Sequence, residues 1–240
     1  MKKTAFISGA NKGIGFEIAR QLGVAGFTIF LGARNPALGE DAASKLRAEG
    51  LDVRFVELDL DRLETAATAA AAIDANGGKL DVLVNNAGIV EAGDGPPSTV
   101  NLDAARRTMD VNFFGMLAVT QAMLPLLRKA PAARIVNLSS GLGSITLNGD
   151  PSWDFAPYKY VGYNTSKAAV NMLTVQLAYE LRETAIKVNA VNPGYTATDI
   201  NGNKGTQTLP EGAAESVRMA LLPADGPTGA FLETGGTLPW

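Results

Sequence analysis

Residues 4–15 read TAFISGANKGIG, a short apolar run followed at once by three closely spaced glycines. The apolar run predicts a buried first strand, and the glycines predict a tight turn into a first helix. Such a turn lets the backbone approach a pyrophosphate, whose charge the N-terminus of a helix favours. The spacing is G-x-x-x-G-x-G rather than the common G-x-G-x-x-G, so an ordinary glycine-rich turn stays open as an alternative. Its position directly after the first strand favours a dinucleotide site.

Apolar runs and helical patterns alternate along the rest of the chain. This alternation predicts βαβ units, and therefore a parallel sheet with helices on both faces. Right-handed crossovers restrict the topology to a doubly wound, Rossmann-type α/β fold: a single domain, residues 1–240, with a mostly parallel seven-stranded sheet. The expected strands are Thr4–Ser8, Thr28–Leu31, Val53–Glu57, Val82–Val84, Arg134–Leu138, Lys187–Val191 and Ala230–Leu232. The expected helices lie near residues 13–25, 37–49, 62–75, 103–129, 162–183 and 211–221.

Two segments, Gly141–Val161 and Tyr195–Leu209, show no clear periodicity. Both follow strands expected to end at the edge of the sheet where open α/β folds bind ligands. Because long irregular segments in a compact fold are often functional, we expect substrate loops near residues 141–161 and 195–209. The aromatic side chains of the first loop fit an apolar substrate wall and simple loop packing equally well. They are Trp153, Phe155, Tyr158 and Tyr160.

The composition excludes several classes of chemistry. The chain has 240 residues and contains neither cysteine nor histidine, which excludes disulfides, thiolate catalysis, the usual zinc sites and histidine-based triads. We therefore expect no metal, and acid–base catalysis must use Asp, Glu, Lys or Tyr. The net charge of −3, without a local basic cluster, predicts no nucleic-acid partner. With a short N-terminal apolar stretch and no run judged long enough to span a membrane, we expect a cytoplasmic protein without membrane contact.

The end of the second expected strand bears on the choice of cofactor. A site for NAD usually has an acid there, which accepts from the ribose 2′-hydroxyl. This chain instead reads Leu-Gly-Ala-Arg over residues 31–34. Arg34 and Lys12 together can hold a 2′-phosphate, although both also fit solvated surface positions. The sequence therefore favours NADP(H).

Tyr163 and Lys167 lie four residues apart at the start of a helical pattern, so their side chains share one face. A nearby ammonium stabilises tyrosinate, which makes the phenol a usable acid. A bare Y-x-x-x-K is common, but Tyr158 and Tyr160 serve as internal controls because neither has a lysine four residues on. The pair therefore points to proton transfer.

Five motifs occur in the order seen in classical short-chain dehydrogenases/reductases, and the chain resembles that family over essentially its whole length. They are Ser8–Gly15, Asn85–Gly88, Ser139–Ser140, Tyr163–Lys167 and Pro193-Gly194-x-x-x-Thr198. Three stretches resemble NADPH-dependent carbonyl reductases more closely: residues 11–15, residues 111–115 and the tail from Pro193 to Trp240. One departure is Ser8, which replaces the usual threonine but keeps a hydroxyl.

The resemblance implies roles for four catalytic residues. Tyr163 would donate a proton to the carbonyl oxygen, and Ser140 rather than the adjacent Ser139 would hydrogen-bond that oxygen. Lys167 would also hold the nicotinamide ribose. Asn112 would position a water that relays protons to Lys167, and the alternative for Asn112 is a polar residue that faces solvent.

The resemblance also implies a cofactor cleft. Asp59 would accept from the adenine amine, although an acid near a helix N-terminus is a strong alternative. Thr198, with the backbone at Pro193 and Thr196, would hold the nicotinamide carboxamide. The complete expected set is Ser8, Gly9, Asn11, Lys12, Gly13, Ile14, Gly15, Arg34, Asp59, Leu60, Asn86, Ala87, Gly88, Val111, Tyr163, Lys167, Pro193, Gly194, Thr196 and Thr198.

We therefore expect NADPH-dependent reduction of a small ketone, aldehyde or quinone to an alcohol. The alternatives are a β-ketoacyl thioester reductase, a specific alcohol dehydrogenase and, less favoured because the catalytic set is intact, a non-catalytic NADP(H) sensor. A carrier-protein substrate would need a basic docking patch, and the nearby pairs are Arg106–Arg107 and Arg128–Lys129. The interval from Ser140 to Tyr163 is longer than in the simplest family members, and it leaves open a homodimer or homotetramer.

Overall fold

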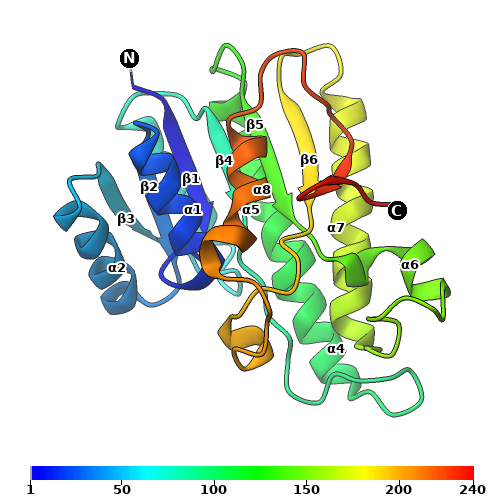
Figure 1. The fold of residues 1–240 in the computed structure, drawn as a ribbon. Coiled ribbons are helices and arrows are strands. Elements are labelled where there is room, and N and C mark those ends of the chain that lie inside the picture. The colour runs from blue at the N-terminus through cyan, green and yellow to red at the C-terminus, as the bar shows by residue number, and fades with distance from the viewer. Residues whose placement is uncertain (1) are drawn as a thin grey trace.

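The computed structural model describes residues 2–240, which form one eight-stranded sheet in the order β3-β2-β1-β4-β5-β6-β7-β8 (Figure 1). The first seven strands are parallel, as predicted, and β8 pairs antiparallel with β7. The strands are β1 Thr4–Ser8, β2 Thr28–Ala33, β3 Val53–Glu57, β4 Val82–Asn85, β5 Arg134–Leu138, β6 Lys187–Val191, β7 Phe231–Glu233 and β8 Gly236–Thr237. The sequence did not predict β8, because two residues are too few to show an alternating pattern.

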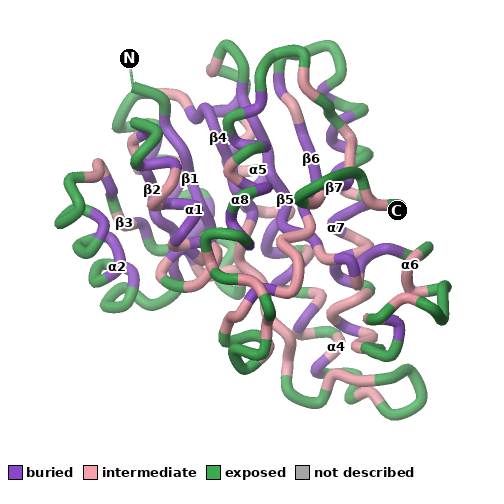
Figure 2. Tube along the Cα trace, viewed as in Figure 1, coloured by how far each residue is buried: buried purple, intermediate pink, exposed green. Residues whose placement is uncertain are grey.

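Helices cover both faces of the sheet, and successive strand residues alternate between two cores. Ile7 of β1 belongs to the core that contains buried residues of α1, α2 and α8, whereas its neighbour Phe6 belongs to the core that contains buried residues of α3, α5 and α7. Figure 2 shows the central strands β1, β4, β5 and β6 buried along most of their length between these two layers. The helices are α1 Gly13–Val24, α2 Pro36–Ala48, α3 Glu64–Asp74, α4 Leu102–Met109, α5 Met116–Leu127, α6 Ile145–Gly149, α7 Val161–Glu180 and α8 Leu209–Ala220. This arrangement confirms the doubly wound α/β prediction.

The strand order reverses between β1 and β4, and this switch point places the ligand crevice of an open α/β sheet. In Figure 1 β1 runs downward from the N-terminus, so the carboxyl ends of the parallel strands lie at the lower edge, near α4 and α6. Ser8 and Asn85 end the two strands that flank the switch point.

The helix predicted near residues 103–129 is one continuous stretch whose central turn, Asp110–Gly115, is π-helical. Such turns cannot be read from periodicity, and they occur frequently at functional sites. The stretch Leu102–Leu127 is also long and apolar enough to cross a membrane, contrary to the expectation that no such run exists. Half of its most apolar window is buried inside the fold, as in a core helix.

The two segments predicted to be irregular contain short local elements. A 3-10 turn, Gly141–Gly143, and α6 occupy the start of the first segment, and a 3-10 turn, Asp199–Asn201, lies in the second. Ser144 caps α6 by accepting from the Leu147 N–H at 3.1 Å. Elements of one turn are set by such capping rather than by an apolar stripe, so the sequence pattern does not reveal them.

Candidate active site

Tyr163 and Lys167 lie in the first two turns of α7, and the Lys167 Nζ is 5.7 Å from the centroid of the Tyr163 ring. Lys167 is buried and donates to the Leu138 carbonyl at the end of β5, at 2.7 Å. Burial penalises the charged form and lowers the pKa of Lys167 to about 8. The ammonium is therefore held beside the tyrosine, with a pKa near neutrality.

Of the two serines after β5, Ser140 is the one that meets Tyr163. Burial raises the pKa of Tyr163, and the interaction with the Ser140 hydroxyl lowers it by a smaller amount. The Ser140 Oγ also accepts from the Leu142 N–H at 3.2 Å, which fixes its orientation. Ser139 is buried, and its hydroxyl donates to the Lys167 carbonyl at 3.3 Å. The chain thus turns Ser139 inward and Ser140 toward the phenol.

Asn112 lies in the π-helical turn and is buried, so it does not face solvent. Its side-chain amide forms two hydrogen bonds with the backbone of Ile89: it accepts from the N–H at 2.8 Å and donates to the carbonyl at 2.9 Å. The second amide hydrogen goes to the Ser166 hydroxyl at 3.0 Å. Both amide hydrogens are donated to protein acceptors. A relay water at this residue would therefore have to donate to the Oδ1 or to the backbone carbonyl oxygen of Asn112.

Gly88 brings Asn112 and Lys167 to a common point. A Cβ placed on Gly88 would lie 3.3 Å from the Asn112 Oδ1 and 3.5 Å from the Lys167 Nζ. The two polar groups therefore flank the same small space beside the chain that leaves β4. The structure brings all four predicted catalytic residues to the carboxyl edge of the sheet.

The chain segments that leave β1 and β4 are tied together at the switch point. The Ser8 hydroxyl accepts from the Asn86 and Ala87 N–H groups, both at 3.0 Å, so the serine fills the expected place of a threonine. The Asn86 amide donates back to the carbonyls of Ser8 and Gly9 at 2.9 and 3.0 Å. Gly9 has φ +64°, and a Cβ there would lie 2.9 Å from the Ala87 Cα, so only glycine fits.

The start of α1 suits an anionic cofactor group. The residue that precedes the helix is Lys12, and its side chain makes no capping bond within the described part of the chain. The N–H groups of the first turn are therefore left for a ligand or solvent. Gly13 and Gly15 open this turn, and a Cβ on Gly13 would meet only the Thr198 Cγ2, at 3.9 Å. The other predicted cofactor residues of this region are Asn11 and Ile14 beside the turn, Val111 in the π-helical turn, and Pro193 and Gly194 after β6.

The two cations predicted to read the ribose have different surroundings. The Lys12 Nζ lies 2.5 Å from an Asp199 carboxylate oxygen, and both side chains are exposed. Hydrogen bonding and charge from Lys12 hold the pKa of Asp199 below its usual range. Arg34 directly follows β2, is exposed, and takes part in none of the ion pairs among residues 2–240. Asp199 was not predicted, because no sequence pattern links it to the glycine-rich turn.

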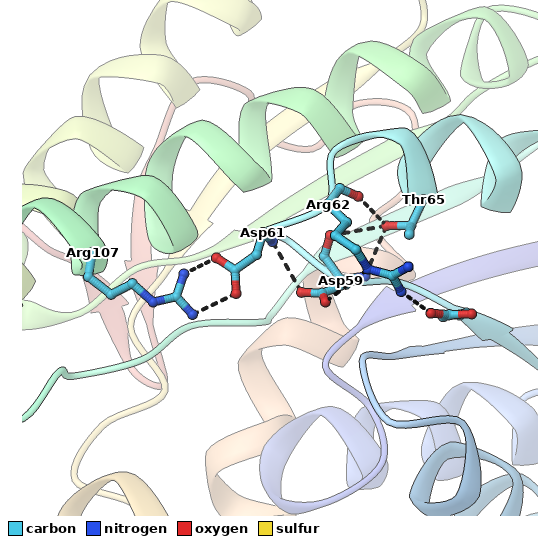
Figure 3. A network of polar contacts seen from close by, with 6 residues as sticks. Asp59, Asp61, Arg62, Thr65 and Arg107 are labelled. Carbon is cyan, nitrogen blue, oxygen red and sulfur yellow. Dashed lines mark hydrogen bonds and ion pairs between the residues drawn. The ribbon is translucent and has the colours of Figure 1, made fainter.

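Asp59 belongs to a polar network after β3 (Figure 3). Its carboxylate accepts from the Asp61 N–H at 3.1 Å and from the Arg62 Nε at 3.3 Å. Because α3 begins only at Glu64, Asp59 does not cap that helix but closes the turn before it. Asp61 in turn forms a two-pronged ion pair with Arg107 of α4, with one contact at 2.6 Å.

Leu60 and the segment after β6 pack against neighbouring parts of the crevice. A Cβ on Gly115 would lie 2.7 Å from the Leu60 Cβ, so Leu60 seats the Asp59 turn on the π-helical turn. The buried Thr196 donates its hydroxyl to the Pro193 carbonyl at 3.0 Å, which folds this segment back on itself. The Thr198 methyl group faces Gly13, so the second loop borders the glycine-rich turn.

The aromatic residues of the first loop pack on one another and on the second loop. The Phe155 ring lies 5.6 Å from the Trp153 and Tyr195 rings, centroid to centroid. Trp153 also packs on Gly141, where a Cβ would lie 3.1 Å from the indole Cζ2. The aromatic residues therefore do pack the loop onto itself, and this packing places the Trp153 ring beside Gly141, the residue after Ser140.

Sequence reasoning missed Asp94, whose carboxylate binds the start of α7 at the Tyr163 N–H, 2.8 Å away. Asp94 lies in an Asp-Gly-Pro-Pro stretch that indicates a turn, and nothing in the sequence pairs that turn with a helix 69 residues away. It also missed Ser166, the hydrogen-bond partner of Asn112.

Residues 3–209 match the family model described as short chain dehydrogenase. The chain belongs to the short-chain dehydrogenase family. This short-chain dehydrogenase is 34% identical to a Mus musculus carbonyl reductase 1 whose name specifies NADPH, over 279 aligned positions that cover 100% of this chain and 99% of the relative. It is 31% identical to salutaridine reductase of Papaver bracteatum, over 96% of this chain and 94% of the relative.

Solved structures agree with this assignment. The short-chain dehydrogenase superposes on an NADPH-bound carbonyl reductase from chicken fatty liver with a TM-score of 0.87 and 28% identity, covering 100% of this chain and 99% of the other. The TM-score to salutaridine reductase from Papaver somniferum is 0.84 at 29% identity, over 96% and 99% of the two chains. As a member of this family, the chain is an NAD(P)-dependent oxidoreductase.

Proposed function

We propose that this short-chain dehydrogenase reduces a ketone, aldehyde or quinone to an alcohol with NADPH, and that Tyr163 is the proton donor. The observation that carries the proposal is the convergence of Ser140 and Lys167 on Tyr163 at the carboxyl edge of the sheet. A module that only sensed a nucleotide would need no buried lysine beside a tyrosine.

The roles of the side chains follow from their surroundings. Burial raises the pKa of Tyr163, so the phenol stays protonated and available as a donor to the carbonyl oxygen. The Ser140 hydroxyl adds a second hydrogen bond to that oxygen as negative charge develops on it. After the transfer, the Lys167 ammonium stabilises the tyrosinate. With a pKa of about 8, Lys167 can also return a proton to Tyr163 near neutral pH.

The residues present fit the cofactor. The uncapped first turn of α1 would hold the pyrophosphate, and residues 86–88 would line the crevice. Lys12 and Arg34 would hold the 2′-phosphate, and the relatives named for NADPH support that preference. When bound, NADPH would supply the hydride.

The charge distribution favours a small free substrate over one carried by a protein. A thioester reductase that acts on a carrier protein would need an unpaired basic patch near the crevice. The four candidate cations are instead ion-paired: Arg106 with Asp103, Arg107 with Asp61, Arg128 with Glu180 and Lys129 with Asp74.

The test follows NADPH oxidation with a panel of ketones, aldehydes and quinones. We expect Tyr163→Phe to lower kcat/KM by roughly 10²–10⁴-fold and to leave NADPH binding, measured by fluorescence titration, unchanged. Tyr158→Phe is the matched control, because Tyr158 is exposed and has no lysine one helical turn on. Undiminished turnover in Tyr163→Phe would show the mechanism to be wrong, and equal turnover with NADH would overturn the cofactor preference.

A further inference from the structure

The helix that carries Tyr163 starts without a cap of its own. α7 begins at Val161, and the residue before it, Tyr160, makes no side-chain capping bond. A helix end leaves several N–H groups without partners, and buried ones must be satisfied from elsewhere. Here the partners come from a loop far away in the sequence.

That loop, residues 89–101 between β4 and α4, supplies acceptors for three consecutive N–H groups of α7. The Gly95 carbonyl accepts from the Val161 N–H at 3.0 Å. The two carboxylate oxygens of Asp94 accept from the next two residues, Gly162 at 2.9 Å and Tyr163 at 2.8 Å. Asp94 is therefore bonded directly to the backbone of the proposed proton donor.

The packing around Gly162 is adapted to this contact. A Cβ on Gly162 would lie 3.0 Å from the Asp94 carboxylate and 2.9 Å from the Ala105 Cα of α4. A larger residue would push the carboxylate and α4 away from the helix start. The glycine just before Tyr163 thus lets three chain segments meet where the catalytic helix begins.

The same loop also contacts the rest of the site. Ile89, at the start of the loop, is hydrogen-bonded through its backbone to the Asn112 amide, and the preceding Gly88 lies beside Lys167. Residues 88–95 therefore connect the space between Asn112 and Lys167 to the backbone of Tyr163. A carboxylate at a helix N-terminus is also stabilised by the helix dipole, which favours Asp94 in this place.

We propose that Asp94 is the positioning residue of Tyr163: its carboxylate holds the first turn of α7 so that the phenol stays in reach of Ser140 and Lys167. The inference rests on the proposed function, since it assigns Asp94 a part in proton donation by Tyr163. Asp94 itself does not touch the reacting atoms. It acts through the backbone of the residue that does.

The experiment compares Asp94→Ala, Asp94→Asn and the parent. Asparagine keeps one acceptor and alanine keeps none, so kcat should fall in the order Asp, Asn, Ala, by about tenfold or more for alanine, because small misplacements of a catalytic group are costly. The Kd for NADPH should stay within about twofold, since the glycine-rich turn is untouched. The solvent deuterium isotope effect on kcat should rise, because proton transfer from a misplaced Tyr163 becomes more rate-limiting. Hydrogen exchange at the amides of residues 161–163 should accelerate.

Asn101→Ala is the matched control. Asn101 caps α4, accepting from the Asp103 and Ala104 N–H groups at 2.8 and 3.2 Å, so its removal costs two similar bonds at a neighbouring helix start. It should lower Tm comparably and leave kcat and the isotope effect as in the parent.

Two results would each overturn the proposal: a parental kcat in Asp94→Ala, or unchanged hydrogen exchange at residues 161–163. A fall in kcat that Asn101→Ala reproduces, with an unchanged solvent isotope effect, would also overturn it. If Asp94→Ala does not fold, the same criteria apply to Asp94→Asn. Tyr163→Phe is measured in parallel. Loss of turnover in Tyr163→Phe together with normal Asp94 variants refutes only the positioning role, whereas normal turnover in Tyr163→Phe refutes the proposed function.

Discussion

Gly9→Ala tests the crossing of the chain segments at the switch point. Gly9 has φ +64°, a region in which a residue with a Cβ is strained by about 1–2 kcal/mol. The new Cβ would also lie 2.9 Å from the Ala87 Cα, a backbone atom that can move only with its segment. That movement would stretch the bonds from the Asn86 and Ala87 N–H groups to the Ser8 hydroxyl. Each of these bonds contributes about 0.5–1.5 kcal/mol.

The summed cost is about 3.5 kcal/mol of unfolding free energy, taken from the middle of those ranges. For a chain of this size, each kcal/mol lowers Tm by roughly 2–4 °C, so we expect a loss of roughly 7–14 °C. Differential scanning calorimetry of the protein without cofactor measures this shift. Fluorescence titration should also show weaker NADPH binding, because the displaced segment is the one that we propose lines the cofactor crevice.

Gly202→Ala provides the control for strain alone. Gly202 has φ +61°, nearly that of Gly9, and a Cβ there meets nothing within 4 Å. It should lose only the conformational part, about 1–2 kcal/mol. Equal losses of Tm in the two variants would refute the close approach between Gly9 and Ala87.

Three further changes have defined outcomes. Ser140→Ala should lower kcat by roughly 10²-fold in the NADPH assay. Ser139→Ala should lower kcat far less, because the Ser139 hydroxyl faces the backbone of α7. A larger loss of kcat in Ser139→Ala than in Ser140→Ala would show that Ser140 is the wrong serine. Lys167→Met should abolish turnover yet raise Tm at pH 7, because burial lowers the pKa of this lysine from 10.5 to about 8 and the fold disfavours its charge. Between those two pKa values the unfolded parent binds more protons than the folded parent, so the free energy of unfolding of the parent rises with pH. The excess of the Lys167→Met Tm over the parental Tm should therefore shrink from pH 8 to pH 10.5 in thermal scans. A constant difference in Tm would contradict the shifted pKa. Asp199→Asn should release Lys12 and raise the preference for NADPH over NADH by roughly twofold to fivefold in Kd, and an unchanged ratio would show that the ion pair does not compete with the 2′-phosphate.

The sequence predicted those parts of the molecule that are governed by regular periodicity. Seven strands and the long helices were found because their apolar residues repeat at intervals set by the backbone geometry. The pair Tyr163 and Lys167 was found for the same reason, since a helical spacing of four places both side chains on one face.

The missed features depend on contacts between distant segments. The bond from Asp94 to the Tyr163 N–H joins residues 69 positions apart, and the ion pair of Lys12 with Asp199 joins residues 187 apart. Neither leaves a local pattern, because the partner is chosen by the folded chain. The π-helical turn was missed because an apolar helix reads the same with or without one extra residue in a turn.

That extra residue has a consequence for the phase of the helix. A π-helical turn bonds each N–H one residue further back than an α-helical turn does, so residues 110–115 fit one residue more into the same length. Each residue of an α-helix advances the side-chain direction by about 100°. Deleting one exposed residue here, Phe114, would let α4 and α5 run on as a single regular helix with both packed faces in phase, while Asn112 would turn away from Ile89. A one-residue gap at this point in an aligned sequence would therefore mark a protein that keeps the fold but loses the contact of Asn112 with Ile89.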